Sequence, residues 1–214
     1  MGIYVNGILG PFSGKVGNVI GSNWRSVDYL LSRPTPSAAK MGSAKQKQAR
    51  KRFAMAAEFI SPLRDLINLS YPVKKGSRKS GFDMAMAHVI DSITENEEGL
   101  IIAYKDIQIA RGPLSPIEGA FSTAEGDQVS FIWKPKISIG TAEGNDIVYI
   151  VMYHTERKEY YVFSDRKRSD GRRDLNLNEI GDGAFEVWTF TSTYDCVRFS
   201  NSVYNGTFAV NKKN

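Results

Sequence analysis

The chain has 214 residues, with 28 Lys and Arg, 23 Asp and Glu, one cysteine and 42% hydrophobic residues. This length suits one large domain or two small ones, and the composition excludes a disordered chain, a collagen and a disulfide-rich scaffold. No apolar run reaches the roughly 20 residues that a bilayer-spanning helix needs, and the positive start of a secretory signal is missing. We therefore expect cytoplasmic synthesis without a signal peptide.

The net charge of +5 conceals an uneven distribution along the chain. Residues 1–80 contain 14 basic and 3 acidic side chains, a net charge of +11. Residues 81–214 contain 14 basic and 20 acidic side chains, a net charge of −6. This polarity predicts two parts with different surroundings, the basic one facing nucleic acid, an acidic neighbour, or the acidic part of another copy.

The first 35 residues are rich in glycine and favour a β-hairpin. Residues 16–20 and 24–31 are rich in β-branched and aromatic side chains, and Gly21-Ser22-Asn23 between them is typical of a turn. Glycines within the first strand also permit another backbone to approach closely. Because an isolated hairpin is marginally stable in water, we expect it to pack on the rest of the chain or on another subunit.

A helical region follows a stiff, proline-containing connector at residues 33–37. Ser43 and Gln46 form the pattern of a capping box, which predicts a helix that begins there. Apolar residues then recur at spacings of three and four, on one stripe with a break near Pro62: Ala49, Phe53, Ala56, Ile60, Leu63 and Ile67. A second helix is predicted over residues 83–93, so that the two form an α-hairpin.

From about residue 100 the hydrophobic period becomes that of strands. Seven β-rich segments are separated by turn residues: 101–109, 128–134, 147–154, 160–165, 185–192, 197–202 and 207–210. The number and the short spacing of these segments indicate an antiparallel β-sandwich of the immunoglobulin or fibronectin type III kind. The predicted fold class is therefore α+β, with a β-hairpin and a basic α-hairpin in residues 1–98 and an immunoglobulin-like sandwich in residues 99–214.

The sequence contains little that supports catalysis. Residues 10–15 resemble a phosphate-binding loop but have the wrong glycine spacing and no Ser or Thr after Lys15. Cys196 lies in an alternating stretch that predicts a small buried side chain, and His88 and His154 have no metal-ligand spacing. The carboxylates of residues 81–214 lie mostly beside turn residues. We predict no catalytic, cofactor-binding or metal-binding residues, and a protein that is not an enzyme.

The basic clusters are the clearest positive signal. The predicted basic patch comprises Lys74, Lys75, Arg78, Lys79, Arg166, Lys167 and Arg168. Such side chains can neutralise phosphates, but no interleaved aromatic residues suggest a base-stacking platform. A solvated face or a contact between subunits is the alternative interpretation.

The first 70 residues closely resemble a known family, and the C-terminal part resembles it loosely. The segment from Gly10 to Trp24, the pair Arg33-Pro34, and Ser43, Gln46, Arg50 and Phe53 at their spacing match an uncharacterised bacterial family. Its members share a Gly-x-Phe-Ser-Gly-Lys-Val-Gly signature and a Gln/Arg/Phe helix, and many end in a strand like residues 200–204. The family has no assigned activity, and similar patterns occur in phage-associated proteins. The resemblance thus implies an architecture and a component of a particle or filament.

The leading hypothesis is a non-catalytic structural protein that self-associates as a subunit of a particle, filament or phage-like virion. Head-to-tail contact between copies would suit the polarity of charge. The interface candidates are Gly14, Gly17, Gly21, Trp24, Arg50 and Arg52. The alternatives are a nucleic-acid-binding protein that uses residues 45–80 and a surface- or carbohydrate-binding module with Phe121 in a sandwich loop. No cofactor or small-molecule substrate is predicted.

Overall fold

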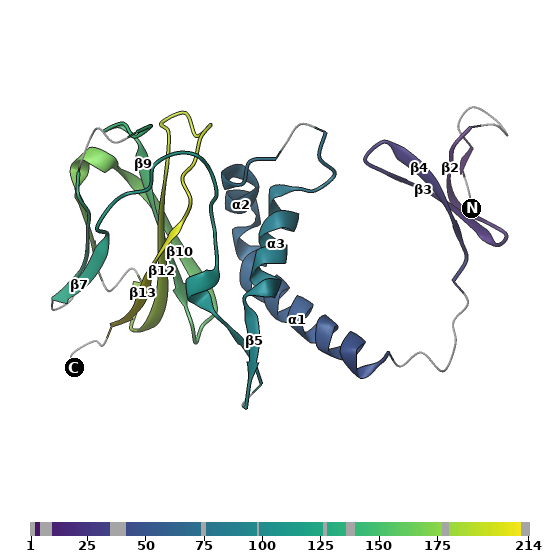
Figure 1. Cartoon of the computed structure of the whole chain (residues 1–214), viewed down its shortest axis with the longest axis horizontal. Helices are drawn as coiled ribbons and strands as arrows, with labels where there is room; N and C mark the ends of the chain where they lie inside the picture. The colour runs from purple at the N-terminus through teal and green to yellow at the C-terminus, as the bar shows by residue number, and fades with distance from the viewer. Residues whose placement is uncertain are drawn as a thin grey trace. The chain divides into compact units, whose positions relative to one another are not determined.

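The computed structural model describes residues 3–4, 10–34, 42–73, 76–97, 99–125, 128–135, 140–176 and 180–210. The chain forms two compact units, Met1–Lys47 and Gln48–Asn214 (Figure 1). Helices and antiparallel sheets occur together, so the fold class is α+β, as expected. No helix in the described part of the chain has both the length and the apolar character that a membrane span requires.

The N-terminal unit is a meander of antiparallel strands. Its four strands pair in chain order: β1 (Ile3–Tyr4), β2 (Phe12–Val16), β3 (Val19–Trp24) and β4 (Val27–Ser32). The turn expected at residues 21–23 is wrong, because these residues lie inside β3. The turns are instead at residues 17–18 and 25–26. Gly17 has a φ of 58° at the first position of its two-residue turn, where type II′ hairpins require glycine.

The first helix begins and breaks where the sequence predicts, whereas the last helix lies two residues before its predicted range of 83–93. Ser43, just before α1 (Ala44–Ile60), and Gln46 in its first turn exchange backbone-to-side-chain hydrogen bonds of 3.3 and 3.0 Å, which confirms the capping box. Pro62 interrupts the helix as a 3-10 turn, η2 (Ser61–Leu63), before α2 (Arg64–Ser70). The last helix, α3 (Gly81–Asp91), has its own capping box from Ser80 and Asp83.

The β-strands agree with prediction in part. The strands are β5 (Ile93–Asn96), β6 (Gly99–Ile102), β7 (Phe121–Glu125), β8 (Gln128–Ile132), β9 (Ile147–His154), β10 (Glu159–Lys167), β11 (Arg172–Asn176), β12 (Gly183–Ser192) and β13 (Val203–Val210). Short 3-10 turns follow β6, as η3 (Tyr104–Asp106), and β10, as η4 (Arg168–Asp170). The segment 197–202 is a loop with isolated bridges, and the predicted strand 101–109 is a strand only at residues 101–102. The strands β5, β7 and β11 were not foreseen.

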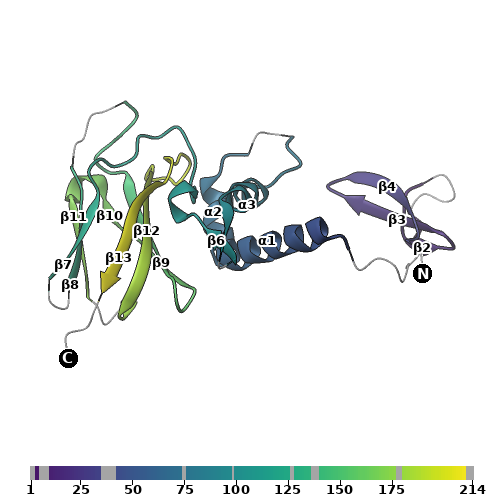
Figure 2. The same ribbon diagram turned by 60° about the horizontal axis from the view of Figure 1, so that its bottom comes forward.

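The second unit has three layers, with a four-stranded sheet in the middle. This central sheet has the order β10-β9-β12-β13, and the outer sheet has the order β11-β8-β7. The helices cover the face of the central sheet opposite the outer sheet, as Figures 1 and 2 show. One apolar core lies on each face of the central sheet, so β9 is buried along almost its whole length. An uninterrupted apolar strand is what burial on both faces requires.

The apolar core on the helical face of the central sheet explains why the helices and the strands belong to one compact unit. Phe59 of α1, Ile67 of α2 and Val89 of α3 pack with Tyr153 and Trp188 of the central sheet. The helices therefore share a core with the strands that follow them. The sequence placed a domain boundary at residues 98 and 99, where the hydrophobic period changes, whereas the compact units meet at residues 47 and 48.

Candidate functional site

The N-terminal sheet presents an apolar face formed by alternate residues of β3 and β4. The strand register places Ile20 opposite Leu31, and Trp24 opposite Val27. Tyr29 lies on this face too, opposite Ser22. Residues directly opposite in an antiparallel pair point to the same side of the sheet. We call this surface the Trp24 face and define it by Ile20, Trp24, Val27, Tyr29 and Leu31.

The Trp24 face is not covered by any described residue of the N-terminal unit. Trp24 and Leu31 are each 49% exposed, and Tyr29 is 40% exposed. Between Phe12 and Ser32 only Gly21 is buried. A sheet is normally apolar on one face because that face packs on another layer. This unit thus has an apolar face without a core.

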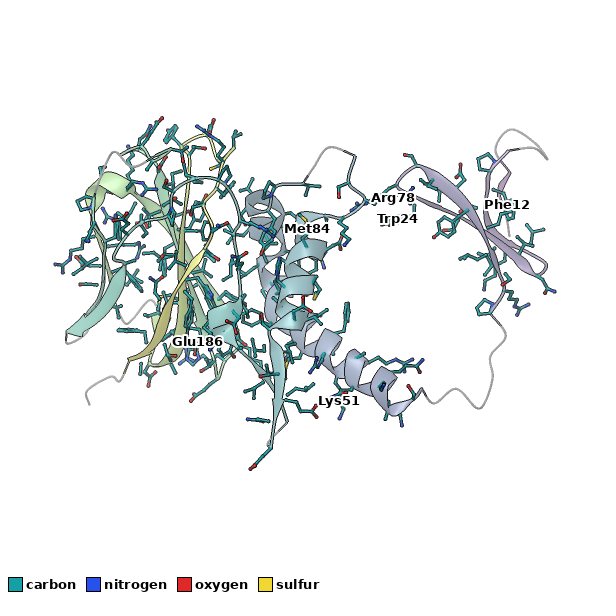
Figure 3. The ribbon with its side chains drawn as sticks, viewed as in Figure 1. Phe12, Trp24, Lys51, Arg78, Met84 and Glu186 are labelled. Atoms are coloured by element: carbon teal, nitrogen blue, oxygen red, sulfur yellow. The ribbon has the colours of Figure 1, made fainter. Side chains whose placement is uncertain are left out.

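The opposite face is partly closed by Phe12, labelled with Trp24 in Figure 3. A Cβ atom added to Gly21 would lie 2.1 Å from the carbonyl oxygen of Phe12 and 2.7 Å from its ring. The close approach predicted for the glycines is therefore made, at Gly21, with Phe12 of the same chain. Gly14 pairs with Gly21 in the ladder and has a φ of 113°, which glycine adopts readily.

The turn between β3 and β4 contains two residues in the left-handed region. Arg25 has a φ of 50° and Ser26 a φ of 65°. Two-residue hairpins of type I′ need positive φ at both positions and normally contain Asn-Gly or Asp-Gly. The guanidinium of Arg25 lies 5.0 Å from the ring centroid of Trp24, a cation–π contact that holds Arg25 in this turn.

Replacing Ser26 with Gly is expected to stabilise the N-terminal sheet by about 1 kcal/mol, because glycine adopts positive φ without steric cost. Amide hydrogen exchange of residues 19–32 measures the effect as slower exchange. Ser22→Gly is the matched control, since its glycine lies within β3 and should accelerate exchange. Faster exchange in Ser26→Gly would contradict the turn assignment.

The basic interface candidates lie on α1 and differ in exposure. Arg50 is exposed, as are all residues from Ala44 to Lys51, and Lys51 is labelled in Figure 3. Arg52 is half-buried, and its Nε atom has no hydrogen-bond partner among the described residues. Phe53 was expected in the buried stripe, but it is 57% exposed. The first half of α1 is thus a solvated cationic helix.

The predicted basic patch is divided by the fold. Arg78 and Lys79 are exposed before α3, and Lys74 and Lys75 lie outside the described residues. Arg166 and Lys167 are exposed at the end of β10. Arg168 is only 3% exposed, so its assignment to a surface patch is wrong.

Arg168 is instead the centre of a buried polar network. Its Nε donates to Asp146 at 3.2 Å, and its terminal nitrogens donate to the carbonyls of Ser115 and Pro116 and to the hydroxyl of Thr191. The planar guanidinium, which carries five donors, suits this arrangement. The charge is thus used to hold the loop before β7 against η4 and β12.

A pocket of about 300 Å³ opens on the helical side of the central sheet. It is lined by Met55, Glu58, Phe59, Leu100, Ile101, Ile102, Tyr104, Tyr153, Thr155 and Lys158. Lys158 and Glu58 pair at 2.8 Å on its rim, which leaves each charge already compensated. The rest of the lining is mainly apolar, and nothing in it arranges donors and acceptors for a particular ligand.

Three residues that line this pocket, Phe59, Tyr104 and Tyr153, belong to a cluster of aromatic rings. Phe59 contacts the rings of Tyr104, Tyr153, Tyr160 and Trp188 at centroid distances from 5.0 to 6.2 Å. Burial raises the pKa of Tyr104 to about 12 and moves the pKa of Tyr160 well above its usual value. The tyrosines are therefore neutral packing groups at physiological pH.

Burial also raises the pKa of Tyr71 to about 12, and its hydroxyl donates to the carbonyl of Gln108 at 2.6 Å. A phenol whose pKa is higher in the folded than in the unfolded chain stabilises the fold fully below pH 10. That contribution is lost as the pH rises toward 12. The urea concentration at the midpoint of unfolding should be constant from pH 8 to pH 10 and should fall from pH 10 to pH 12. Tyr104→Phe should reduce the fall, and an equally steep fall would contradict this origin.

The other groups with catalytic potential have structural partners. Glu186, labelled in Figure 3, is buried and accepts hydrogen bonds from Tyr204 and Thr207. The Nδ1 atom of His154 accepts from the amide of Arg157 at 3.2 Å, and its Nε2 lies 3.0 Å from the carbonyl of Asp182. Within the described ranges, no three His, Cys, Asp or Glu side chains gather as a metal site requires.

Cys196 and Phe121 do not add a site. Cys196 was expected to be a small buried side chain, but it is only half-buried, beside Tyr149, in the loop after β12 with a φ of 56°. Phe121 begins β7, and its side chain lies outside the described residues. The proposed loop module therefore stays a prediction.

The sequence did not single out Tyr29, Leu30 and Leu31. Three consecutive large apolar residues in one strand place apolar side chains on both faces, and that signal was present in β4. Leu30 is 65% exposed on the face opposite Trp24. Together with the uncovered Trp24 face, it makes the N-terminal sheet the strongest candidate for an interface.

Comparison with known proteins agrees with the resemblance seen in the sequence. No curated protein matches the chain significantly. A protein-family model with the description "Family of unknown function (DUF6266)" matches residues 11–206. This range includes β2, the helices and nearly all of the central and outer sheets. The chain therefore belongs to the DUF6266 family of unknown function.

Proposed function

We propose that this protein is a non-catalytic assembly subunit that self-associates through its N-terminal sheet, as a component of a particle, filament or virion. The observation that carries the proposal is the apolar sheet without a core. Complete burial of one large aliphatic side chain is worth about 1.5–3 kcal/mol. Covering five side chains that are each exposed in part would therefore favour association substantially.

Tryptophan fluorescence tests this proposal directly. The chain has three tryptophans, of which Trp133 and Trp188 are buried and Trp24 is 49% exposed. Quenching by acrylamide therefore reports mainly on Trp24. Self-association should reduce quenching as protein concentration rises, in parallel with a larger mass by light scattering. Leu31→Ser keeps the Trp24 reporter and should remove the concentration dependence of both quenching and mass, because Leu31 is 49% exposed on the same face. A monomer at every concentration would overturn the proposal.

Salt separates two modes of self-association. Contact between the +11 and −6 parts of different copies would weaken strongly with added salt, because exposed charges are screened beyond about 10 Å at 0.1 M. Contact through an apolar sheet would be little affected or strengthened. We expect the second behaviour, because the uncovered residues are mainly apolar.

We also propose that the sandwich is of the immunoglobulin or fibronectin type III kind. If β7 to β13 are named A, B, C, C′, E, F and G, then A, B and E form one sheet and C′, C, F and G form the other. Immunoglobulin sandwiches likewise pair B with E in one sheet and C with F and G in the other. Cross-strand NOEs between Ser130 and Asp174 would support this order, and their absence would contradict it.

Nucleic-acid binding is the second candidate, supported by the exposed cations of α1. Lys45, Lys47, Arg50 and Lys51 all lie on its solvated first half. This function predicts DNA binding whose affinity falls steeply with salt. Exchange of these four residues for glutamine should abolish binding without changing the oligomeric state. A lack of binding at low salt would exclude it.

A further inference from the structure

We propose that β4 pairs with β4 of a second copy, antiparallel and about a two-fold axis at Leu30, so that two N-terminal sheets become one continuous sheet. This inference rests on the proposed self-association and names its partner and register. This pairing uses the edge of the sheet at β4, whereas association through the Trp24 face uses one flat surface of the sheet.

The outer edge of β4 is open. In the order β1-β2-β3-β4, β4 pairs only with β3 among the described strands. All six of its residues, Val27–Ser32, are exposed. Proteins protect open edges with lysine, proline, bulges or very short strands, and an unprotected apolar edge is a template for another strand. Here Asp28 is the one charged residue within β4, and Asn23 of β3 already donates to it at 2.6 Å.

Symmetry restricts how two such edges can pair. A two-fold axis perpendicular to the sheet keeps the equivalent faces of the two copies on the same side. Residues opposite each other in an antiparallel pair also point to the same side, whereas successive residues alternate. The axis must therefore pass through a residue that lies opposite its own copy. With the axis at Leu30, that residue meets its own copy. Tyr29 then meets Leu31, Asp28 meets Ser32, and Val27 meets Arg33.

This register is favourable at the positions next to the axis. Tyr29 and Leu31 form an aromatic–aliphatic pair twice, and the Asp28 carboxylate meets a serine hydroxyl. An axis at Tyr29 would bring Arg25 opposite Arg33, a repulsive pair. An axis at Leu31 would bring Asp28 opposite Pro34, which has no N–H to donate. The Leu30 axis is thus the one that avoids both faults.

A second copy suits this edge better than an unrelated strand. A two-fold interface must be self-complementary, and the Leu30 register meets that requirement without like charges opposite each other. Pairing would also bring the Trp24 faces of the two copies onto the same side, with Tyr29 of each packed against Leu31 of the other.

A charge at the axis tests the edge. Leu30→Lys places two ammonium groups opposite each other, and because Leu30 is 65% exposed the single chain tolerates the change. We expect the dimer dissociation constant to rise about tenfold or more, measured by light scattering on dilution. Val16→Lys is the control, since Val16 is 40% exposed on β2, away from the edge, and should leave the dissociation constant unchanged.

Disulfide formation tests the register in the full-length chain with Cys196 replaced by Ser. Leu30→Cys should form a cross-linked dimer under mild oxidation, because opposite residues have Cα atoms about 4.5–5.5 Å apart. Ser32→Cys is the matched control. Its two copies would be offset by four residues, about 13 Å along the strands, and should not cross-link.

The outcomes separate this inference from the proposed function. A wild-type protein that stays monomeric contradicts both. A wild-type oligomer that Leu30→Lys does not weaken and Leu30→Cys does not cross-link overturns the edge pairing and leaves association through the Trp24 face. Equal cross-linking of Leu30→Cys and Ser32→Cys overturns the register.

Discussion

Replacing Arg168 with Ala is expected to destabilise the second unit by about 3–5 kcal/mol. The side chains of Arg168 and Asp146 are 4% and 1% exposed, so loss of the guanidinium leaves a buried carboxylate without its cation. The carbonyls of Ser115 and Pro116 each lose the hydrogen bond from Arg168 in the same step, although Thr191 still donates to Ser115 at 3.2 Å. Urea unfolding followed by circular dichroism measures the loss.

Arg166→Ala is the control for this variant. Arg166 lies two residues away, is about half exposed and approaches Asp165 at 3.8 Å, so its removal should cost at most about 1 kcal/mol. The double change Arg168→Met and Asp146→Leu should recover part of the loss, because both partners of the buried pair are then removed together. Similar stabilities for Arg168→Ala and Arg166→Ala would show that the network is not structural.

Replacing Trp188 with Ala is expected to cost a similar amount, about 3–5 kcal/mol. Trp188 is fully buried at the contact of the central sheet and the helices, with its ring near Phe59, Tyr104 and Tyr204. Its removal leaves a cavity that rigid neighbouring rings cannot fill. The near-ultraviolet circular dichroism should weaken, and the urea midpoint should fall.

Trp188→Phe separates packing from hydrogen bonding. The Nε1 atom of Trp188 has no hydrogen-bond partner among the described residues, so the smaller ring should cost clearly less than Ala. Tyr194→Ala, at a loop position that is 68% exposed, should cost less than about 0.5 kcal/mol. If Phe and Ala at residue 188 were equally costly, the polar nitrogen would have a role that the structure does not show.

Local signals predicted the elements whose ends depend on nearby residues. The capping box at Ser43 and the interruption at Pro62 were found where expected. Each depends on atoms within one turn of helix. The strand at 147–154 was also found at its predicted bounds. By contrast, Phe53 fits the helical stripe but is exposed, because no described element of the second unit covers that turn of α1.

The candidate site was predicted less completely, because exposure depends on what packs against each residue. Trp24 was recognised as a large apolar residue, but the sequence allowed both a core and an interface position. Arg168 was grouped with Arg166 by proximity in the sequence, and a 3-10 turn directs its side chain into the protein. Leu30 was missed because its importance depends on β4 having an open edge.

The sequence by itself determined the α+β class, the helix starts and breaks, the polarity of charge and the family-like N-terminal signature. These features depend on propensity and spacing over a few residues. Only the tertiary structure decided that the helices share a core with the central sheet and that Arg168 is internal. It also decided that no described residue of the N-terminal unit covers the Trp24 face. Burial depends on contacts between residues far apart in the chain, and spacing along the sequence does not record them.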